Sequence, residues 1–285
     1  MRVVIGVDWS DQAFAAVTQT FRLYHPTDVT LVHGVDLGML QSPVVAQAGN
    51  VQGYEDFRHA MVDAGHKVLD HAATMVPPEI QSIRKVNEVA NPAQLILDSA
   101  DNLSADLTVV GARGRSRLSE VVLGSVSHRV LLHGSRPTLI VRGAARKVQR
   151  VLVAVQDRDD ADRIVAWLTR HPFADPAELR VIHAVVPIRV DDPYDALGTG
   201  TWWEGAERYG EELVKSTAGK LMTARYTVST KVATGAAASV IEQEAQSMDL
   251  VVVTSHGRKG LSRFLLGSVS HAVVHQVACP VLVLR

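Results

Sequence analysis

The sequence predicts an α/β fold of two tandem, doubly wound domains, each built on an open, parallel, five-stranded sheet. Three observations lead to this prediction: the chain length, an internal repeat, and short apolar runs that alternate with helical patterns. The 285 residues suit two domains of about 140 residues each.

The repeat is clearest near the end of each half. A shift of 143 positions aligns residues 106–142 with 249–285 without a gap, and 18 of these 37 positions are identical. The starts also correspond, because residues 2–7 align with 150–155 at an offset of 148. Self-similarity at a fixed period indicates a repeated structural unit. We predict domains at 1–145 and 150–285, with the boundary in the short polar segment 143–149.

Each copy alternates β-branched apolar runs with helical patterns, which is typical of βαβ units. In the first copy we expect strands near 2–7, 28–34, 82–89, 106–111 and 137–142, and helices near 11–24, 55–75, 92–103 and 124–134. In the second copy we expect strands near 150–155, 178–185, 226–233, 249–254 and 280–285, and helices near 160–170, 203–222, 236–247 and 267–277. Such sheets bind ligands beyond the carboxyl ends of their strands, at the topological switch point.

Composition excludes several classes of protein. The 47% of hydrophobic residues is unlike the composition of a disordered chain. The formal net charge of −1 gives no excess of basic residues that would bind nucleic acid or an anionic membrane. The single cysteine, Cys279, excludes intrachain disulfides and cysteine-rich zinc sites. Because no apolar run is long enough to span a membrane and the first residues look like a strand, we expect a cytoplasmic protein.

A glycine pattern follows the fourth strand of the first copy. Gly111 and Gly114 are followed by nine residues and then by Gly124 and Ser125, which open a helix. Glycines let backbone N–H groups approach a ligand, and a helix start favours anions, so the pattern suits phosphate. Turn glycines with a capping serine are the alternative. The pattern is neither a Walker loop nor the Rossmann dinucleotide fingerprint.

This spacing resembles the ATP-binding motif of the universal stress protein family. The opening segment 5–10, the closing Pro-x-Leu-x-Val-Arg, the histidines His33 and His183, and the duplication extend the resemblance over nearly the whole chain. It implies a tandem universal stress protein with a Rossmann-like fold of the adenine nucleotide alpha-hydrolase type. The implied function is a stress-response and regulatory module that binds ATP, with magnesium as a companion of the phosphates.

The resemblance also implies roles for individual residues. In the first copy, Asp8 would read the adenine side, with helix capping as its alternative role. The remaining implied ATP-binding residues are Gly34 and Val35 at the base, Val110, Gly111 and Gly114 at the ribose and first phosphate, Gly124, Ser125 and Val126 at the outer phosphates, and the nearby charges of Arg113 and Arg115. In the second copy the corresponding residues are Gly257, Gly267, Ser268 and Val269.

The second copy departs from the pattern twice. Gln156 stands where the first copy has Asp8, and Thr254 stands where it has Gly111. We therefore expect ATP in the first copy and weaker or absent binding in the second. Asp157 is interpreted as a surface residue, with replacement of the missing acid as its alternative role. The acidic run at 157–162 is interpreted as a solvated helix start in preference to a cation site.

No catalytic residue and no protein-bound metal are predicted. Ser125 and His128 share a helical face, but no orienting acid accompanies them. Two alternatives to the regulatory module stay open: a slow ATPase or autophosphorylating enzyme, and a nucleotide-free interaction scaffold. Single-copy relatives pair through their final strand, so the resemblance implies an intrachain pseudo-dimer through 137–142 and 280–285, with a homodimer as a further option. The sequence leaves ATP hydrolysis, the inducing stress, the protein partner and the oligomeric state open.

Overall fold

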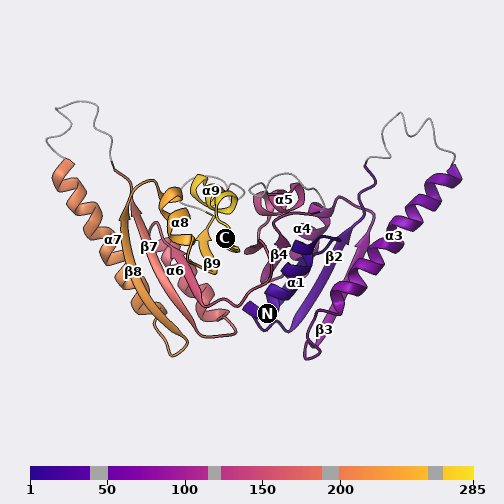
Figure 1. Ribbon diagram of the computed structural model, residues 1–285, viewed down its shortest axis with the longest axis horizontal. Helices are drawn as coiled ribbons and strands as arrows, with labels where there is room; N and C mark the ends of the chain where they lie inside the picture. The colour runs from indigo at the N-terminus through magenta and orange to yellow at the C-terminus, as the bar shows by residue number, and fades with distance from the viewer. Residues whose placement is uncertain (39–50, 115–122, 188–198, 256–265) are drawn as a thin grey trace. The chain divides into compact units, whose positions relative to one another are not determined.

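The computed structural model describes the whole chain except residues 39–50, 115–122, 188–198 and 256–265 (Figure 1). It divides into two compact units, residues 1–145 and 146–285. Each unit is described by itself. In the described part of the chain, no helix is long and apolar enough to cross a membrane.

Unit 1 has the elements that the sequence predicts, in the predicted order. Its strands are β1 (Arg2–Gly6), β2 (Asp28–Gly34), β3 (Ser82–Glu88), β4 (Leu107–Gly111) and β5 (Thr138–Val141). Its helices are α1 (Asp11–Leu23), α3 (Val51–Ala73), α4 (Pro92–Asn102) and α5 (Ser125–His133).

Unit 2 repeats this order. Its strands are β6 (Arg150–Ala154), β7 (Ala177–Val185), β8 (Tyr226–Thr234), β9 (Leu250–Thr254) and β10 (Val281–Leu284). Its helices are α6 (Arg158–Arg170), α7 (Thr199–Leu221), α8 (Ala237–Ala245) and α9 (Ser268–Gln276). The predicted boundaries are close, except that α3 and α7 each begin four residues earlier than expected.

The sheet of each unit is parallel and doubly wound. In unit 1 the strand order is β3-β2-β1-β4-β5, and in unit 2 it is β8-β7-β6-β9-β10. The first strand of each unit pairs with the second on one side and with the fourth on the other, as in the registers Val3↔Val29 and Val3↔Leu107. The chain therefore reverses its winding beside β1 and β6, and this switch point is where such sheets place ligands. The predicted fold class is confirmed.

Burial explains why these segments are strands. The central residues of β1 and β6, including Val3, Ile5, Val151 and Val153, are at most 1% exposed. Helices α1 and α3 pack against the sheet of unit 1. Helix α4, which connects β3 to β4, packs against the sheet and against α5 (Figure 1). Strands covered on both faces need continuous apolar sequences, and these strands have them.

The helix starts differ in how they are capped. Ser10 caps α1 by accepting the Ala13 N–H at 3.2 Å, and Asn91 caps α4 with Pro92 as its first residue. Asp157 caps α6 by accepting the Asp160 N–H at 3.0 Å. Helices α5 and α9 instead follow Gly124 and Gly267, which supply no side-chain cap. Their first N–H groups are thus left for another acceptor.

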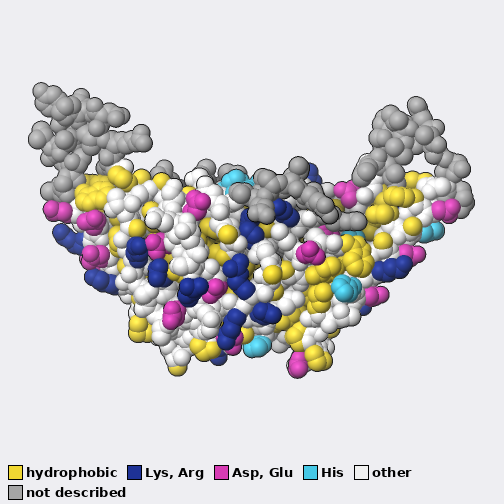
Figure 2. Space-filling view, in the orientation of Figure 1, with side chains coloured by type: hydrophobic (Ala, Val, Ile, Leu, Met, Phe, Trp, Pro, Cys, Tyr) yellow, Lys and Arg dark blue, Asp and Glu magenta, His cyan; other side chains and the backbone are white. Residues whose placement is uncertain are grey.

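The surface carries charges of both signs. On the face drawn in Figure 2, basic and acidic side chains are interspersed over the described elements. This arrangement agrees with the formal net charge of −1 and with the absence of a basic footprint in the sequence.

Candidate functional site

The acid of unit 1 lies at the carboxyl end of β1, where the sequence predicts it. Asp8 is half-buried, and its Oδ1 accepts hydrogen bonds from the Ser10 N–H at 3.0 Å and from the Ser10 hydroxyl. The Ser10 hydroxyl also lies 3.3 Å from the carbonyl oxygen of Arg113. One serine therefore caps α1, orients Asp8 and joins it to the segment that follows β4.

Gly114 lies directly against this acid. A Cβ atom on Gly114 would come within 2.6 Å of Asp8 Oδ2, so a side chain here would push the carboxylate aside. The second glycine of the motif and the acid of β1 are thus brought together, although 105 residues separate them in the sequence. The sequence predicted both residues but gave no reason for their direct contact.

Two other predicted glycines have a packing role. A Cβ on Gly111 would lie 2.7 Å from the carbonyl carbon of Gln12, and a Cβ on Gly34 would lie 2.6 Å from the Cα of Pro92. These glycines let the starts of α1 and α4 approach the strand ends closely. The predicted reason for Gly111, access of a ligand to its backbone, is therefore not needed to explain it. Val35 and Val110 are buried beside them, at 1% and 3% exposure.

The start of α5 is held against β4 and presents free donors. The Gly124 N–H donates to the Ala112 carbonyl at 2.8 Å, and the Ser127 hydroxyl donates to the same oxygen at 2.9 Å. Among the described residues, the N–H groups of Ser125 and Val126 have no hydrogen-bond acceptor. An uncapped helix start with free N–H groups and a positive dipole end favours an anion. Arg113 lies beside it, while Arg115 lies outside the described residues.

Unit 2 has a cavity of about 770 Å³ at the corresponding place. Its lining comes from the ends of β6, β7 and β9 and from the starts of α6, α8 and α9. The predicted residues Gly267, Ser268 and Val269 line it, whereas Gly257 lies outside the described residues. As in unit 1, the glycine before the helix is anchored, here by its N–H donating to the Ser255 carbonyl at 2.8 Å.

The histidines at the ends of the second strands are structural. His33 Nδ1 lies 2.7 Å from the Val7 carbonyl oxygen, and His183 Nδ1 lies 3.0 Å from that of Val155. A glycine on the covering helix makes room for each ring, because a Cβ on Gly65 or Gly210 would lie 2.8 Å from the histidine Cδ2. Each histidine thus fixes the backbone just before Asp8 in unit 1 or just before Gln156 in unit 2.

The buried acid of unit 2 is a residue that the sequence analysis did not single out. Gln156 is exposed, and Asp157, the candidate replacement, uses its Oδ1 to cap α6. Asp160 is the buried acid, at 4% exposure, and it lines the cavity. The interpretation of residues 157–162 as a solvated helix start is therefore wrong for Asp160. The available signal was its alignment with Gln12 at the repeat offset of 148.

Burial shifts the pKa of Asp160. Its Oδ1 accepts the Thr254 hydroxyl at 2.6 Å, and its Oδ2 lies 3.4 Å from the Gln156 N–H. Burial raises the pKa of Asp160 to about 6, and the negative charge of Asp157 adds to this rise, while the hydrogen bond from Thr254 opposes it. Thr254, which stands where unit 1 has Gly111, is therefore a partner of this acid.

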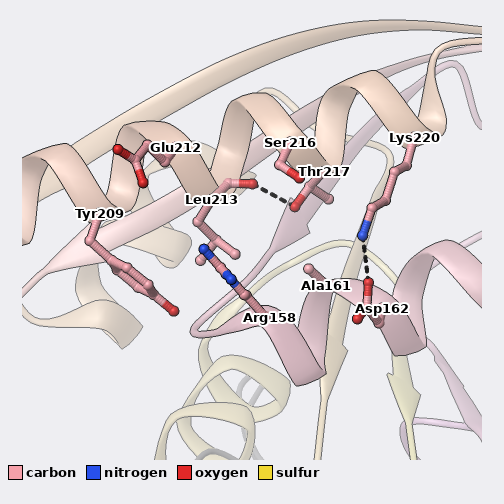
Figure 3. Close-up of a pocket in the computed structure, with 9 residues that line it drawn as sticks. All are labelled: Arg158, Ala161, Asp162, Tyr209, Glu212, Leu213, Ser216, Thr217 and Lys220. Carbon is pink, nitrogen blue, oxygen red and sulfur yellow. Dashed lines mark hydrogen bonds and ion pairs between the residues drawn. The ribbon is translucent and has the colours of Figure 1, made fainter.

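A second cavity of unit 2, about 450 Å³, lies between α6 and α7 (Figure 3). Arg158 extends from α6 toward Tyr209 of α7, and Lys220 closes one end through an ion pair with Asp162 at 2.7 Å. The Thr217 hydroxyl is used within α7, where it donates to the Leu213 carbonyl at 2.7 Å. Two basic and two acidic side chains line this cavity, so its charge favours neither anions nor cations.

Comparisons with known proteins agree over the whole chain. The profile of the Universal stress protein family matches residues 1–142 and again 147–285. A universal stress protein of Mycolicibacterium smegmatis is 32% identical over 292 residues, covering 99% of this chain and 96% of its own length. One from Mycobacterium tuberculosis is 26% identical over 299 residues, with the same coverage of both chains.

Solved structures agree on the fold. The crystal structure of a universal stress protein from Archaeoglobus fulgidus matches with a TM-score of 0.64 at 19% identity, covering 100% of this chain and 96% of that one. A putative universal stress protein from Pseudomonas aeruginosa matches with a TM-score of 0.59 at 16% identity, covering 99% and 92%.

Proposed function

Because this chain belongs to the universal stress protein family, we propose that it is an ATP-binding regulatory module of the stress response. The nucleotide binds at the carboxyl ends of the strands in each unit, with its phosphates at the starts of α5 and α9. The observation that carries this proposal is the 770 Å³ cavity of unit 2, which lies at the switch point beside an uncapped helix start.

The residues in these places suit the parts of ATP. The starts of α5 and α9 have no side-chain cap among the described residues, so their first N–H groups suit phosphate oxygens, and exposed Ser125 and Ser268 add a hydroxyl to each. In unit 1, Asp8 keeps Oδ2 available beside Gly114, and a carboxylate suits an amine or hydroxyl donor of the nucleoside. Magnesium bound with ATP is held mainly by the phosphates and water, so few protein ligands are needed.

Unit 2 departs from unit 1 on the side of the nucleoside. Exposed Gln156 brings a carboxamide where Asp8 brings a charge, while the helix start at Gly267 and Ser268 is retained. We therefore expect both units to bind the nucleotide, with the weaker affinity in unit 2.

A pair of matched variants tests this proposal unit by unit. Ser125→Glu and Ser268→Glu each place a carboxylate at the first residue of the helix, where it repels phosphate but favours the helix itself. Titration calorimetry with ATP and magnesium should show a loss of about a hundredfold in the affinity of the altered unit alone, since each tenfold is about 1.4 kcal/mol and like charges cost several.

Ser125→Gln and Ser268→Gln are the controls, because they add bulk without charge. We expect them to weaken ATP by less than about tenfold, the loss of one hydroxyl contact. If the glutamate variants bind ATP as the original protein does, the proposed phosphate site is wrong. If the original protein binds no nucleotide at all, the scaffold interpretation replaces it. Conversion of bound ATP to ADP that ceases in the glutamate variants would favour the ATPase.

A further inference from the structure

The two units exchange an acid and an amide between two positions four residues apart, one at the strand end and one in the first turn of the helix. Unit 1 has Asp8 and Gln12, and unit 2 has Gln156 and Asp160 at the corresponding positions, four residues apart in each case. Each unit therefore keeps one carboxylate and one carboxamide beside the switch point, but in opposite order. A simple loss of the acid in unit 2, as its sequence first indicates, does not describe this pattern.

In both units the second member of each pair joins the first helix to the fourth strand or to the segment directly after it. In unit 1, Gln12 Oε1 accepts the Arg113 N–H at 3.0 Å and so joins α1 to the segment after β4. In unit 2, Asp160 Oδ1 accepts the Thr254 hydroxyl at 2.6 Å and so joins α6 to the end of β9. A neutral amide performs this structural task in unit 1, so the task alone does not require a charged group.

Asp160 also occupies the right place to meet a ligand. It lines the 770 Å³ cavity together with Gln156, Thr254 and Ser268, and it reaches this cavity from the first turn of α6. The β6–β9 pairing places it beside the switch point of the unit. Its burial keeps water from competing for the carboxylate, which strengthens a hydrogen bond from a bound donor.

We propose that Asp160 is the specificity-determining acid of unit 2, that it accepts a hydrogen bond from a hydroxyl or amine of the nucleoside part of the ligand, and that it makes this site pH-dependent. This inference rests on the proposed function. It assigns to unit 2 a ligand-binding carboxylate that lies in α6 and not at the end of β6.

The charged groups around Asp160 determine how it responds to pH. On α6, Asp157 opposes its ionisation and Arg163, 4.0 Å from Oδ1, favours it. From β9 it faces the Thr254 hydroxyl, and from the end of β6 the Gln156 N–H. On α7, which packs against α6, Lys220 is paired with Asp162. His183 lines the same cavity, so the experiment must separate its contribution from that of Asp160.

The sign of the effect follows from hydrogen bonding. Above a pH of about 6 the carboxylate is ionised and can accept from a ligand donor. Below that pH it carries a proton, which leaves one fewer acceptor and removes the charge that strengthens the bond. The contribution of Asp160 to ligand affinity should therefore be present at neutral pH and lost on acidification.

The test uses the full chain with Ser125→Glu, so that unit 2 alone binds the nucleotide. The affinity for ATP in excess magnesium is measured from about pH 5 to about pH 8 with Asp160 and with Asp160→Asn. Taking the ratio of the two affinities at each pH removes every pH effect that the two proteins share, including that of the phosphates. We expect a ratio of about ten near pH 8 and below about three near pH 5. A ratio that is the same at every pH, or equal to one throughout, overturns the proposal.

Two further variants make the test specific. Asp159→Asn removes an exposed acid from the same turn of α6 and should leave affinity and pH profile unchanged. Thr254→Val removes the hydroxyl that favours the charged form, so it should move the pH midpoint upward; a midpoint that stays or moves down contradicts the assignment. If Ser268→Glu abolishes binding while Asp160→Asn does not affect it, this inference fails and the proposed function stands. If Ser268→Glu has no effect, the proposed function itself fails.

Discussion

Unit 1 and unit 2 each place a carboxylate beside their own switch point, but in two different environments. Asp8 follows the strand, is half-buried and is held by Ser10, whereas Asp160 lies in the first turn of α6 at 4% exposure. The strand-end position leaves the acid near water, and the helix position buries it between two elements. The difference teaches that an acid placed four residues further along the chain becomes buried, and this burial raises the pKa of Asp160.

The same comparison explains why unit 2 has no glycine at the position that corresponds to Gly111. Gly111 is required in unit 1 because the backbone of Gln12 lies where a Cβ would be. In unit 2 the corresponding residue is Thr254, and its side chain is used to bind Asp160. The loss of the glycine and the shift of the acid are therefore two parts of one rearrangement. Substitutions that place a residue of one unit into the other test this conclusion.

The largest expected effect comes from placing the residue of unit 2 into unit 1. Gly111→Thr puts a Cβ within 2.7 Å of the Gln12 backbone, which cannot yield as a side chain can. We expect a loss of about 3 kcal/mol in the free energy of unfolding, typical of overpacking against a rigid neighbour. Urea denaturation measures this loss. Thr254→Ser in unit 2, which keeps the hydroxyl, is the control, and an equal loss in both variants would show that the position is not special to unit 1.

A smaller effect, of opposite sign, is expected for Asp160→Asn in the absence of ligand. The pKa of this carboxyl is raised by burial from 3.8 to about 6, so the folded state binds its proton more tightly than the unfolded state does. The stability from this group is therefore fully present below pH 3.8 and is lost as the pH rises through about 6.

It follows that Asp160→Asn should stabilise the protein at neutral pH by about 2 kcal/mol. The raised pKa costs the native protein about 3 kcal/mol at about 1.4 kcal/mol for each pKa unit, and the asparagine loses about 1 kcal/mol because its amide nitrogen cannot accept the Gln156 N–H. The advantage should shrink as the pH falls from about 6 toward 3.8. Denaturant unfolding at several pH values, compared with Asp159→Asn, measures it. An advantage that grows on acidification would contradict the assigned direction of the pKa shift.

The smallest effect concerns the helix caps that lie beside the two acids. Ser10→Ala removes the cap of α1 and also the partner of Asp8, whereas Asp157→Ala removes the cap of α6 and a charge that disfavours ionised Asp160. Each should cost about 1 kcal/mol of stability. Only Ser10→Ala should also weaken ATP in unit 1, which calorimetry can check. An equal effect of both variants on that unit would argue against the role of Ser10 in orienting Asp8.

Much of the fold follows from the sequence alone. Continuous Val, Ile and Leu runs mark strands that are covered on both faces, and Asn91 with Pro92 marks the start of α4. The starts of α3 and α7 are less predictable, because the first turns of both helices lack an acidic residue that would mark the start.

The site was predictable only in part. Spacing identifies Gly114, Gly124 and Ser125, but it cannot show that Gly111 faces the backbone of Gln12, because that contact depends on how closely α1 packs. Asp160 was missed for a similar reason. Within an acidic run, nothing local separates the residue that a helix turns inward from those that it turns to solvent. The comparison of the two copies at the repeat offset holds that information.

The most direct test of the central claim is the adenine nucleotide content of freshly purified, undialysed protein. The protein is denatured by heat, the supernatant is chromatographed, and nucleotide is expressed per chain for the original protein, Ser125→Glu and Ser268→Glu. We predict bound adenine nucleotide in the original protein, the larger loss in Ser125→Glu and a smaller loss in Ser268→Glu. Equal nucleotide content in all three, or none in the original protein together with a failed titration by ATP and magnesium, would contradict the account.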